Sequence, residues 1–164
     1  MTNFSVLPVR EQIMDAVKER LESMKKNLPT DDPNVRPYAF GFDHVQRQPF
    51  TSASRGKEYI CAIIDNNEFK EPDTDPVVRS TINVIIEFLV LVKSKENPTT
   101  KMNLVFAETE RRLKEDRTFG NLAIDIVVTS SETDIESDQD KYIEGALFFD
   151  IKYRHNNNDP SLRV

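Results

Sequence analysis

The sequence has one cysteine, four glycines and no tryptophan among its 164 residues. The lone Cys61 cannot close a disulfide within the chain and cannot by itself form a zinc site. The glycines lie far apart, and none belongs to a G-x-x-x-x-G-K-[ST] or G-x-G-x-x-G pattern. Nucleotide binding through those two kinds of loop is therefore excluded.

Long apolar runs and an excess of positive charge are also missing. No run approaches the roughly 18 apolar residues that a membrane span needs, and the first residues lack the charged-then-apolar layout of a secretory signal. The 28 acidic residues outnumber the 22 basic ones and leave a formal net charge of −6. We therefore expect a soluble protein made in the cytoplasm, with no membrane attachment and no sequence-specific nucleic-acid binding.

Hydrophobic periodicity is what the sequence does contain. It predicts helices over residues 5–27 and 98–117, strands over residues 38–47, 59–65, 81–92, 122–129 and 142–153, and exposed loops over residues 49–56 and 66–76. Strands and helices do not alternate regularly. This order predicts an α+β fold with a mixed, mainly antiparallel sheet of about five strands and two helices packed on one face. We expect a single domain over residues 1–154, followed by a flexible C-terminal tail over residues 155–164.

The strand at residues 81–92 shows the clearest alternation. Six apolar residues at every second position predict its core face: Ile82, Val84, Ile86, Phe88, Val90 and Val92. The opposite face carries Ile85, Leu89 and Leu91 toward its end. We expect a helix or another subunit to cover these three side chains.

Candidate catalytic side chains are few. Cys61 lies in the apolar run from Tyr59 to Ile64, where a thiol behaves as a small buried hydrophobic group. His44 and His155 are the only imidazole bases, and neither lies beside a serine or cysteine nucleophile motif. One interpretation remains a small cytosolic enzyme or ligand-binding domain with a pocket formed by Cys61, His44 and nearby acids. We assign no catalytic residue, no metal site and no cofactor.

The strongest local charge feature is an acidic hairpin with five carboxylates and no base. These are Glu132, Asp134, Glu136, Asp138 and Asp140. A calcium loop of the EF-hand type is excluded, because counting from Asp134 places Gln139 where glycine is needed and Gly145 where glutamate is needed. The hairpin is either a solvated, self-repelling sheet edge or a negative surface repeated around an oligomer.

Three segments carry a resemblance to a known family. They are Phe-Asp-His-Val-Gln-Arg at residues 42–47, Thr-Phe-Gly-Asn-Leu-Ala-Ile-Asp-Ile at 118–126, and Gly-Ala-Leu-Phe-Phe-Asp-Ile-Lys-Tyr-Arg at 145–154. With the preceding amphipathic helix, this layout resembles the tail terminator and tail-completion proteins of long-tailed bacteriophages, the lambda minor tail protein U-like family. The chain departs from the family at Asn121, where a second glycine is common.

The resemblance implies a structural virion protein without enzymatic activity. Members form a ring, typically hexameric, at the head-proximal end of the tail tube, stop its polymerisation and offer a surface to head-completion or neck proteins. A neck or head-completion protein of the same virion is the alternative. A closed ring needs two different complementary patches on each subunit. Candidate contact residues are Ile85, Leu89, Leu91, Phe50, Arg55, Asp73 and Asp75, and the acidic hairpin is the candidate surface toward the pore through which DNA passes.

Overall fold

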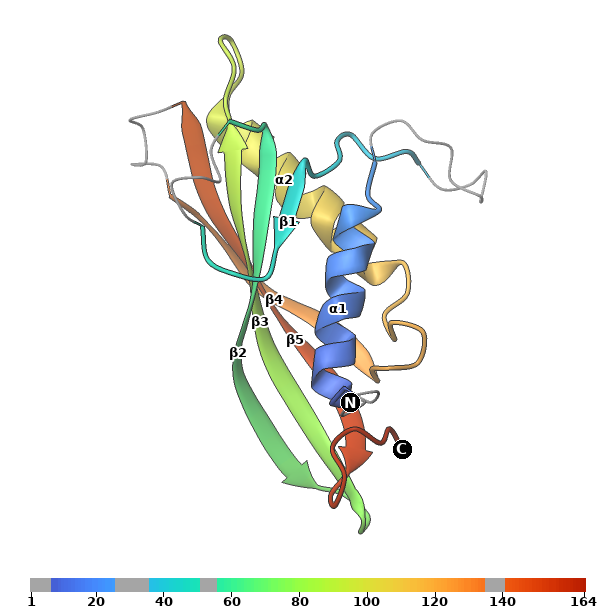
Figure 1. Ribbon diagram of the computed structural model, residues 1–164. Helices are drawn as coiled ribbons and strands as arrows, with labels where there is room; N and C mark the ends of the chain where they lie inside the picture. The colour runs from blue at the N-terminus through green and yellow to red at the C-terminus, as the bar shows by residue number, and fades with distance from the viewer. Residues whose placement is uncertain (1–6, 26–35, 51–55, 135–140) are drawn as a thin grey trace, which may run out of the picture.

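A computed structural model describes residues 7–25, 36–50, 56–134 and 141–164. Its elements are α1 (Val9–Glu22), β1 (His44–Gln46), β2 (Tyr59–Pro72), β3 (Val77–Leu91), α2 (Pro98–Lys114), β4 (Asp125–Asp134) and β5 (Tyr142–Asn156). The sheet order is β1-β2-β3-β5-β4, with β1 parallel to β2 and all other pairs antiparallel. Both helices lie on one face of the sheet (Figure 1). The predicted α+β fold is therefore confirmed.

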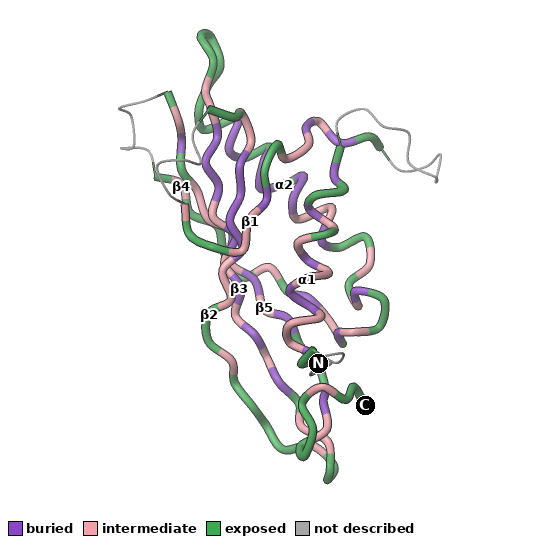
Figure 2. The backbone as a smooth tube through the Cα atoms, viewed as in Figure 1, coloured by how far each residue is buried: buried purple, intermediate pink, exposed green. Residues whose placement is uncertain are grey.

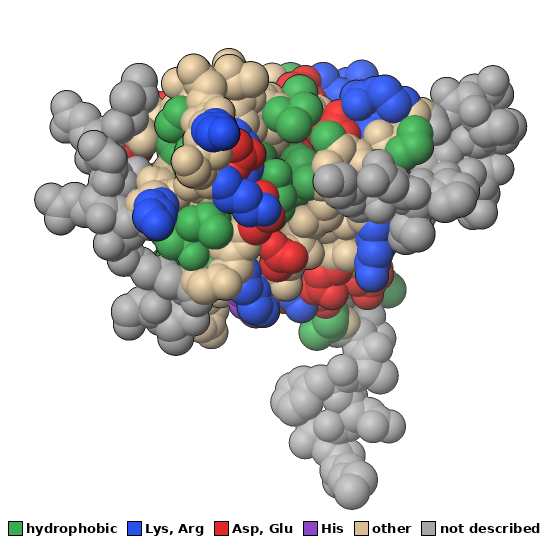
Figure 3. Space-filling view, turned by 90° about the horizontal axis from the view of Figure 1, so that it is seen from above, with side chains coloured by type: hydrophobic (Ala, Val, Ile, Leu, Met, Phe, Trp, Pro, Cys, Tyr) green, Lys and Arg blue, Asp and Glu red, His purple; other side chains and the backbone are tan. Residues whose placement is uncertain are grey.

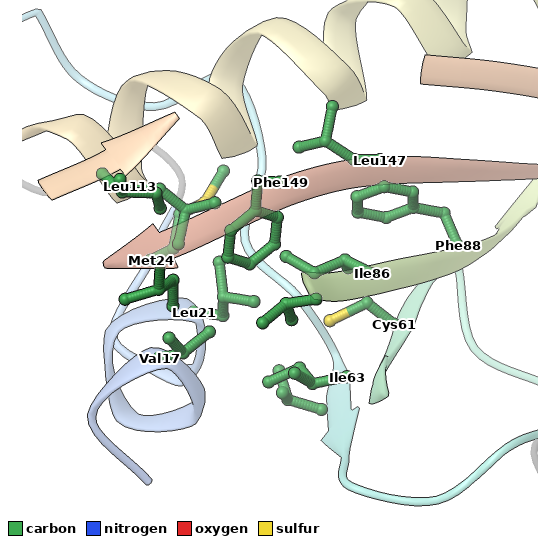
Figure 4. Close-up of a cluster of buried hydrophobic side chains, with 14 of the residues drawn as sticks. Val17, Leu21, Met24, Cys61, Ile63, Ile86, Phe88, Leu113, Leu147 and Phe149 are labelled. Carbon is green, nitrogen blue, oxygen red and sulfur yellow. The ribbon is translucent and has the colours of Figure 1, made fainter. Parts of the chain in front are cut away.

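The core lies between the helices and the sheet face toward them. Phe88 and Phe149 project from β3 and β5 into the layer that Leu21 of α1 and Leu113 of α2 also enter (Figure 4). The predicted alternation of β3 is confirmed, because its five core-facing residues are at most 1% exposed: Ile82, Val84, Ile86, Phe88 and Val90. Val92 follows the end of the strand and packs partly buried against the same core.

The helix α1 is shorter than its apolar pattern predicts. It begins at Val9, with Pro8 as its N-cap, and ends at Glu22, where the prediction covered residues 5–27. Its apolar stripe is buried as expected, including Ile13 and Val17. The periodicity continues to the buried Met24, which shows that an apolar residue can join the core from beyond a helix end.

The helix α2 begins as predicted. The Asn97 side chain accepts a hydrogen bond from the Thr100 N–H at 3.0 Å, and Pro98 occupies the first helical position. The i,i+4 spacing of Glu108 and Arg112 would favour an exposed ion pair on α2, but Glu108 does not form one. It is buried instead, and it accepts hydrogen bonds from Arg36, Arg111 and the Ala39 N–H. Local spacing could not reveal these partners, because Arg36 and Ala39 lie about 70 residues away.

The predicted loop at residues 66–76 is wrong over most of its length. β2 continues through Pro72, and its second half pairs with the first part of β3. This hairpin extends past the N-terminal end of α1 (Figure 1), and Figure 2 shows its β2 strand exposed. Neither α1 nor α2 covers this part of the hairpin. Its strands can therefore carry polar residues, and they lack the apolar alternation that predicts a strand. We call residues 66–81 the arm.

The segment at residues 38–47 is mostly irregular, contrary to the predicted strand. Only His44–Gln46 forms a strand, while Tyr38 and Phe40 pack into the core without one. At Gly41, an added Cβ would lie 2.5 Å from the Met24 carbonyl oxygen. The chain therefore passes too close to the end of α1 for a side chain to fit at this position.

The C-terminal boundary lies later than predicted. His155 and Asn156 belong to β5, and His155 is only 2% exposed. Beyond the strand, the Pro160 carbonyl accepts a hydrogen bond from the Val9 N–H at 3.0 Å, and the Leu162 carbonyl accepts one from the Asn156 N–H at 2.8 Å. The segment assigned to a tail thus joins the start of α1 to the end of β5.

Candidate interaction surface

The face of the sheet opposite the helices, which we call the outer face, carries the predicted apolar contact residues. Ile85, Leu89 and Leu91 alternate with the core-facing residues of β3 and therefore point to this face. Ile85 and Leu91 are half-buried, and Leu89 is 5% exposed. The register places Ile85 between Ile64 of β2 and Phe148 of β5. A partly exposed apolar row thus crosses a face on which neither α1 nor α2 packs.

Carboxylates gather on the same face, at the end toward the β4–β5 connection. Glu132 and Asp134 of the predicted acidic hairpin lie at the end of β4 and are exposed. The register places Glu132 across from Ala146 and Asp134 across from Glu144, while Ala146 also faces Glu87 of β3. Glu87 and Glu144 were missed by sequence reasoning, because only the strand register brings them beside the hairpin acids.

A surface recess accompanies these carboxylates. It has a volume of about 620 Å³ and is lined by Glu87, Glu132, Asp134, Glu144, Pro49, Phe50, Phe88, Thr133, Gly145 and Ala146. Phe50, a predicted contact residue, is half-buried at this site. The structure therefore brings together one predicted contact residue and two hairpin acids. We call this site the acidic recess.

The other predicted contact acids lie at the far end of the molecule, in the turn of the arm. Asp73 pairs with Arg79 at 3.3 Å and with Arg154 at 3.1 Å. Slight desolvation would raise the pKa of Asp73, but the two arginines and the Thr74 N–H outweigh it and lower the pKa. Asp75 is exposed in the same turn. Asp73 therefore stabilises the arm itself, and Asp75 is the freer of the two for an external contact.

Four predicted site residues lie outside the described residues: Arg55, Glu136, Asp138 and Asp140.

A buried polar network lies where the arm leaves the helix-covered part of the sheet. The His155 Nδ1–H donates to the Asn156 carbonyl at 2.9 Å, and His155 Nε2 forms a hydrogen bond with the Ser80 hydroxyl at 3.1 Å. The Tyr153 hydroxyl donates to Glu68, and burial followed by this contact raises the pKa of Tyr153. Glu68 also pairs with Arg10 of α1 at 3.3 Å.

This network contains a serine–histidine pair that the sequence alone did not reveal. Ser80 and His155 are 75 residues apart, and only the register of β3 with β5 brings them together. Their exposed fractions are 0% and 2%, so neither side chain reaches a surface where a substrate could bind. The pair supports the base of the arm rather than a reaction.

Cys61 and His44, proposed as lining one pocket, are not brought together. Cys61 lies in the core, and burial raises the pKa of its thiol well above the usual value, which disfavours the reactive thiolate. His44 is exposed, contacts Gln46 at 3.1 Å and lines a shallow recess between α1 and β1. The predicted pocket formed by Cys61, His44 and nearby acids is therefore wrong.

The end of the molecule beside the start of α2 has mixed charge. Figure 3 shows acidic, basic and hydrophobic side chains interspersed there. Lys101 is buried, and its ammonium group lies 3.0 Å from Glu58, 2.9 Å from Glu96 and 2.7 Å from the Leu91 carbonyl. A cavity of about 960 Å³ opens nearby, lined by Leu91, Val92, Lys93, Ser94, Asn97, Pro98, Thr99, Asp134, Lys141, Tyr142 and Ile143.

The described ranges hold neither a cluster of metal ligands nor an apolar membrane-spanning helix. No group of three or more His, Cys, Asp or Glu side chains there is placed to hold a metal ion. No helix in those ranges is long and apolar enough to cross a membrane.

No family model matches the chain, and no curated protein matches it.

Proposed function

We propose that this chain is a structural virion protein, a tail terminator that forms a ring on the head-proximal end of a phage tail tube. The ring would stop polymerisation of the tube and offer an attachment surface to the head or neck. The resemblance of residues 42–47, 118–126 and 145–154 to that family motivates the proposal. The observation that carries it is the outer face, a sheet surface that neither α1 nor α2 covers and that combines an apolar row with a concentration of carboxylates.

The apolar row supports self-association. Ile64, Ile85 and Phe148 lie side by side across three strands and remain partly exposed. A partly apolar sheet face gains free energy when a partner removes it from water. In a ring, each subunit would supply such surfaces to two neighbours.

The acidic hairpin supports a role at the pore. Glu132 and Asp134 are exposed at the end of β4, and no Lys or Arg lies across from them on β5. A pore rim with repeated carboxylates would repel DNA phosphates and let the duplex pass without binding. Charge reversal at Glu132, Asp134 and Glu136 tests this role. We expect particles to assemble but to eject DNA more slowly, and unchanged ejection would remove the pore assignment.

The ring itself is tested with the purified chain. Light scattering across a concentration series, with negative-stain images of the same samples, should give discrete rings with a central hole. Growing tail tubes supply the second assay, in which the added chain should cap tube ends and fix tube length. Tubes that grow unhindered while the chain binds heads would favour the neck or head-completion alternative.

A further inference from the structure

We propose that residues 66–76, which we call the strap, open from β3 as one unit at a bulge in β2, and that the Arg10 guanidinium group of α1 is the latch that holds the strap closed. The inference concerns a single copy of the chain and does not depend on the proposed ring.

A bulge in β2 separates the strap from the helix-covered part of the sheet. The register of β2 against β3 shifts between Asp65 and Glu68, so Asn66 and Asn67 together face a single residue of β3. Both asparagines are exposed. The ladder between β3 and β5 passes the same level without a shift. The irregularity therefore belongs to β2 alone, and β2 can part from β3 beyond the bulge while β3 stays paired with β5.

The strap has few contacts besides its ladder with β3. Within the described chain β1 pairs with β2 only over residues 60–62, so no strand adjoins the other side of β2 in the strap. Residues 69–72 are exposed, and neither helix lies over them (Figure 1). At the tip, Asp73 contacts Arg79 and Arg154, and the Pro76 carbonyl accepts the Asn157 N–H at 2.7 Å. Segments with so few buried contacts open at a lower free energy than the whole fold.

One side chain of α1 spans the bulge. The Arg10 guanidinium donates to Asp65, before the bulge, at 3.0 Å. It also donates to the Asn66 carbonyl within the bulge at 3.2 Å and to Glu68 after the bulge at 3.3 Å. Glu68 in turn accepts the Tyr153 hydroxyl of β5. Because the guanidinium is a rigid planar fork with five donors, one residue fixes both sides of the bulge, and opening of the strap must break its contact with Glu68.

Opening of the strap would unpair one edge of β3. Residues 78–82 would then offer backbone N–H and C=O groups to an added strand, while the other edge of β3 remains paired with β5. The strap is therefore a cover on a sheet edge, and Arg10 sets how often that edge is exposed.

Amide hydrogen exchange of the full chain, followed residue by residue by NMR, tests the latch. In Arg10→Ala, the amides that join β2 to β3 over residues 68–72 and 78–82 should exchange at least fivefold faster than in the unmodified chain. The amides that join β3 to β5 at the same levels should keep their rates, because that ladder stays closed. Arg10→Lys keeps the charge without the fork and should give an intermediate acceleration. Unchanged rates between β2 and β3 would overturn the latch, and equal acceleration in both ladders would overturn the strap as a separate unit.

The matched control is Arg117→Ala. The Arg117 guanidinium binds the opposite edge of the sheet in a similar way, because it contacts Asp125 at 2.7 and 3.0 Å and the Ile126 carbonyl at 3.2 Å in β4. Its removal should leave exchange in the strap unchanged. Acceleration there equal to that of Arg10→Ala would indicate a general loss of stability and overturn the latch. Circular dichroism checks that each variant is folded.

A double-mutant cycle tests the contact across the bulge. Glu68→Gln keeps an oxygen that can accept the Tyr153 hydroxyl and removes the charge that Arg10 binds. Because Arg10 and Glu68 form one contact, Arg10→Ala should accelerate exchange in the strap less in the Glu68→Gln chain than in the unmodified chain. Equal acceleration in the two chains would overturn a latch that spans the bulge.

Discussion

The helix-covered part of the sheet and the arm are held together by different forces. Under the helices, β3 and β5 present aromatic and branched aliphatic side chains to a dry core. At the base of the arm the same side of β3 and β5 presents Ser80, Tyr153 and His155, joined by hydrogen bonds to one another or to nearby groups. Apolar burial thus stabilises one region, while ladder hydrogen bonds and a polar network stabilise the other. The orientation of the arm therefore depends on few side chains.

Two phenylalanines give the largest expected contrast. Phe88→Ala removes a ring that is 1% exposed and leaves a cavity, so we expect a loss of about 3–5 kcal/mol of unfolding free energy. Phe69→Ala removes an exposed ring from the arm and should change stability by about 0.5 kcal/mol or less. Urea denaturation followed by circular dichroism measures both. A large loss from Phe69→Ala would mean that the isolated arm buries this ring.

The buried carboxylate of Glu108 gives the next largest expected effect on stability. Burial alone would raise the pKa of Glu108, but hydrogen bonds from Arg111, the Ala39 N–H and Arg36 outweigh it and lower the pKa. Because the folded-state pKa is lowered, Glu108 stabilises the protein above its unfolded value of about 4.5. That contribution is lost as the pH falls through the lower folded value. We expect Glu108→Gln to cost about 2–3 kcal/mol at pH 7.

The stability cost of Glu108→Gln should depend on pH. The difference between the original chain and Glu108→Gln should shrink below about pH 4.5, where the original carboxylate also becomes neutral. Glu110→Gln is the control, because Glu110 pairs with Lys114 on the same helix at a partly exposed site. It should change stability by about 0.5 kcal/mol or less at either pH. A pH-independent cost for Glu108→Gln would indicate a packing effect.

The difference between the helix-covered part of the sheet and the arm also explains which strands the sequence could predict. Where a helix covers the sheet, burial imposes alternation, and the residues of β3 that face the core were identified correctly. On the arm no layer imposes that pattern, so residues 66–72 resemble a loop although they form a strand. The Asn97 cap was predictable because capping depends on neighbouring residues alone.

The candidate surface was predictable only in part. Alternation placed Ile85, Leu89 and Leu91 on the outer face, and composition identified Glu132 and Asp134. Glu87 and Glu144 became part of the acidic recess through the strand register, which local sequence does not determine. Ser80 and His155 depend on the same long-range pairing.

The polar network at the base of the arm gives a smaller and more local effect. Tyr153→Phe removes the hydroxyl that donates to Glu68, and we expect a loss of about 1–2 kcal/mol because the acceptor is charged. Hydrogen exchange should accelerate at the arm residues of β2 and β3 before it changes in α2. Uniform acceleration across both regions would show that the arm and the helix-covered core unfold as one unit.

The smallest expected effect comes from a polar contact at the edge of the helix-covered region, the cap at the start of α2. We expect this contact to stabilise the protein less than core packing does. Asn97→Ala removes the acceptor of the Thr100 N–H at the start of α2, and we expect a cost of about 1 kcal/mol. Asn97→Asp keeps an acceptor and should retain most of that stability. Thermal unfolding of the three chains measures the difference. If Asn97→Ala costs as much as Phe88→Ala, the start of α2 contributes as much as core packing, and the contrast between the two regions fails.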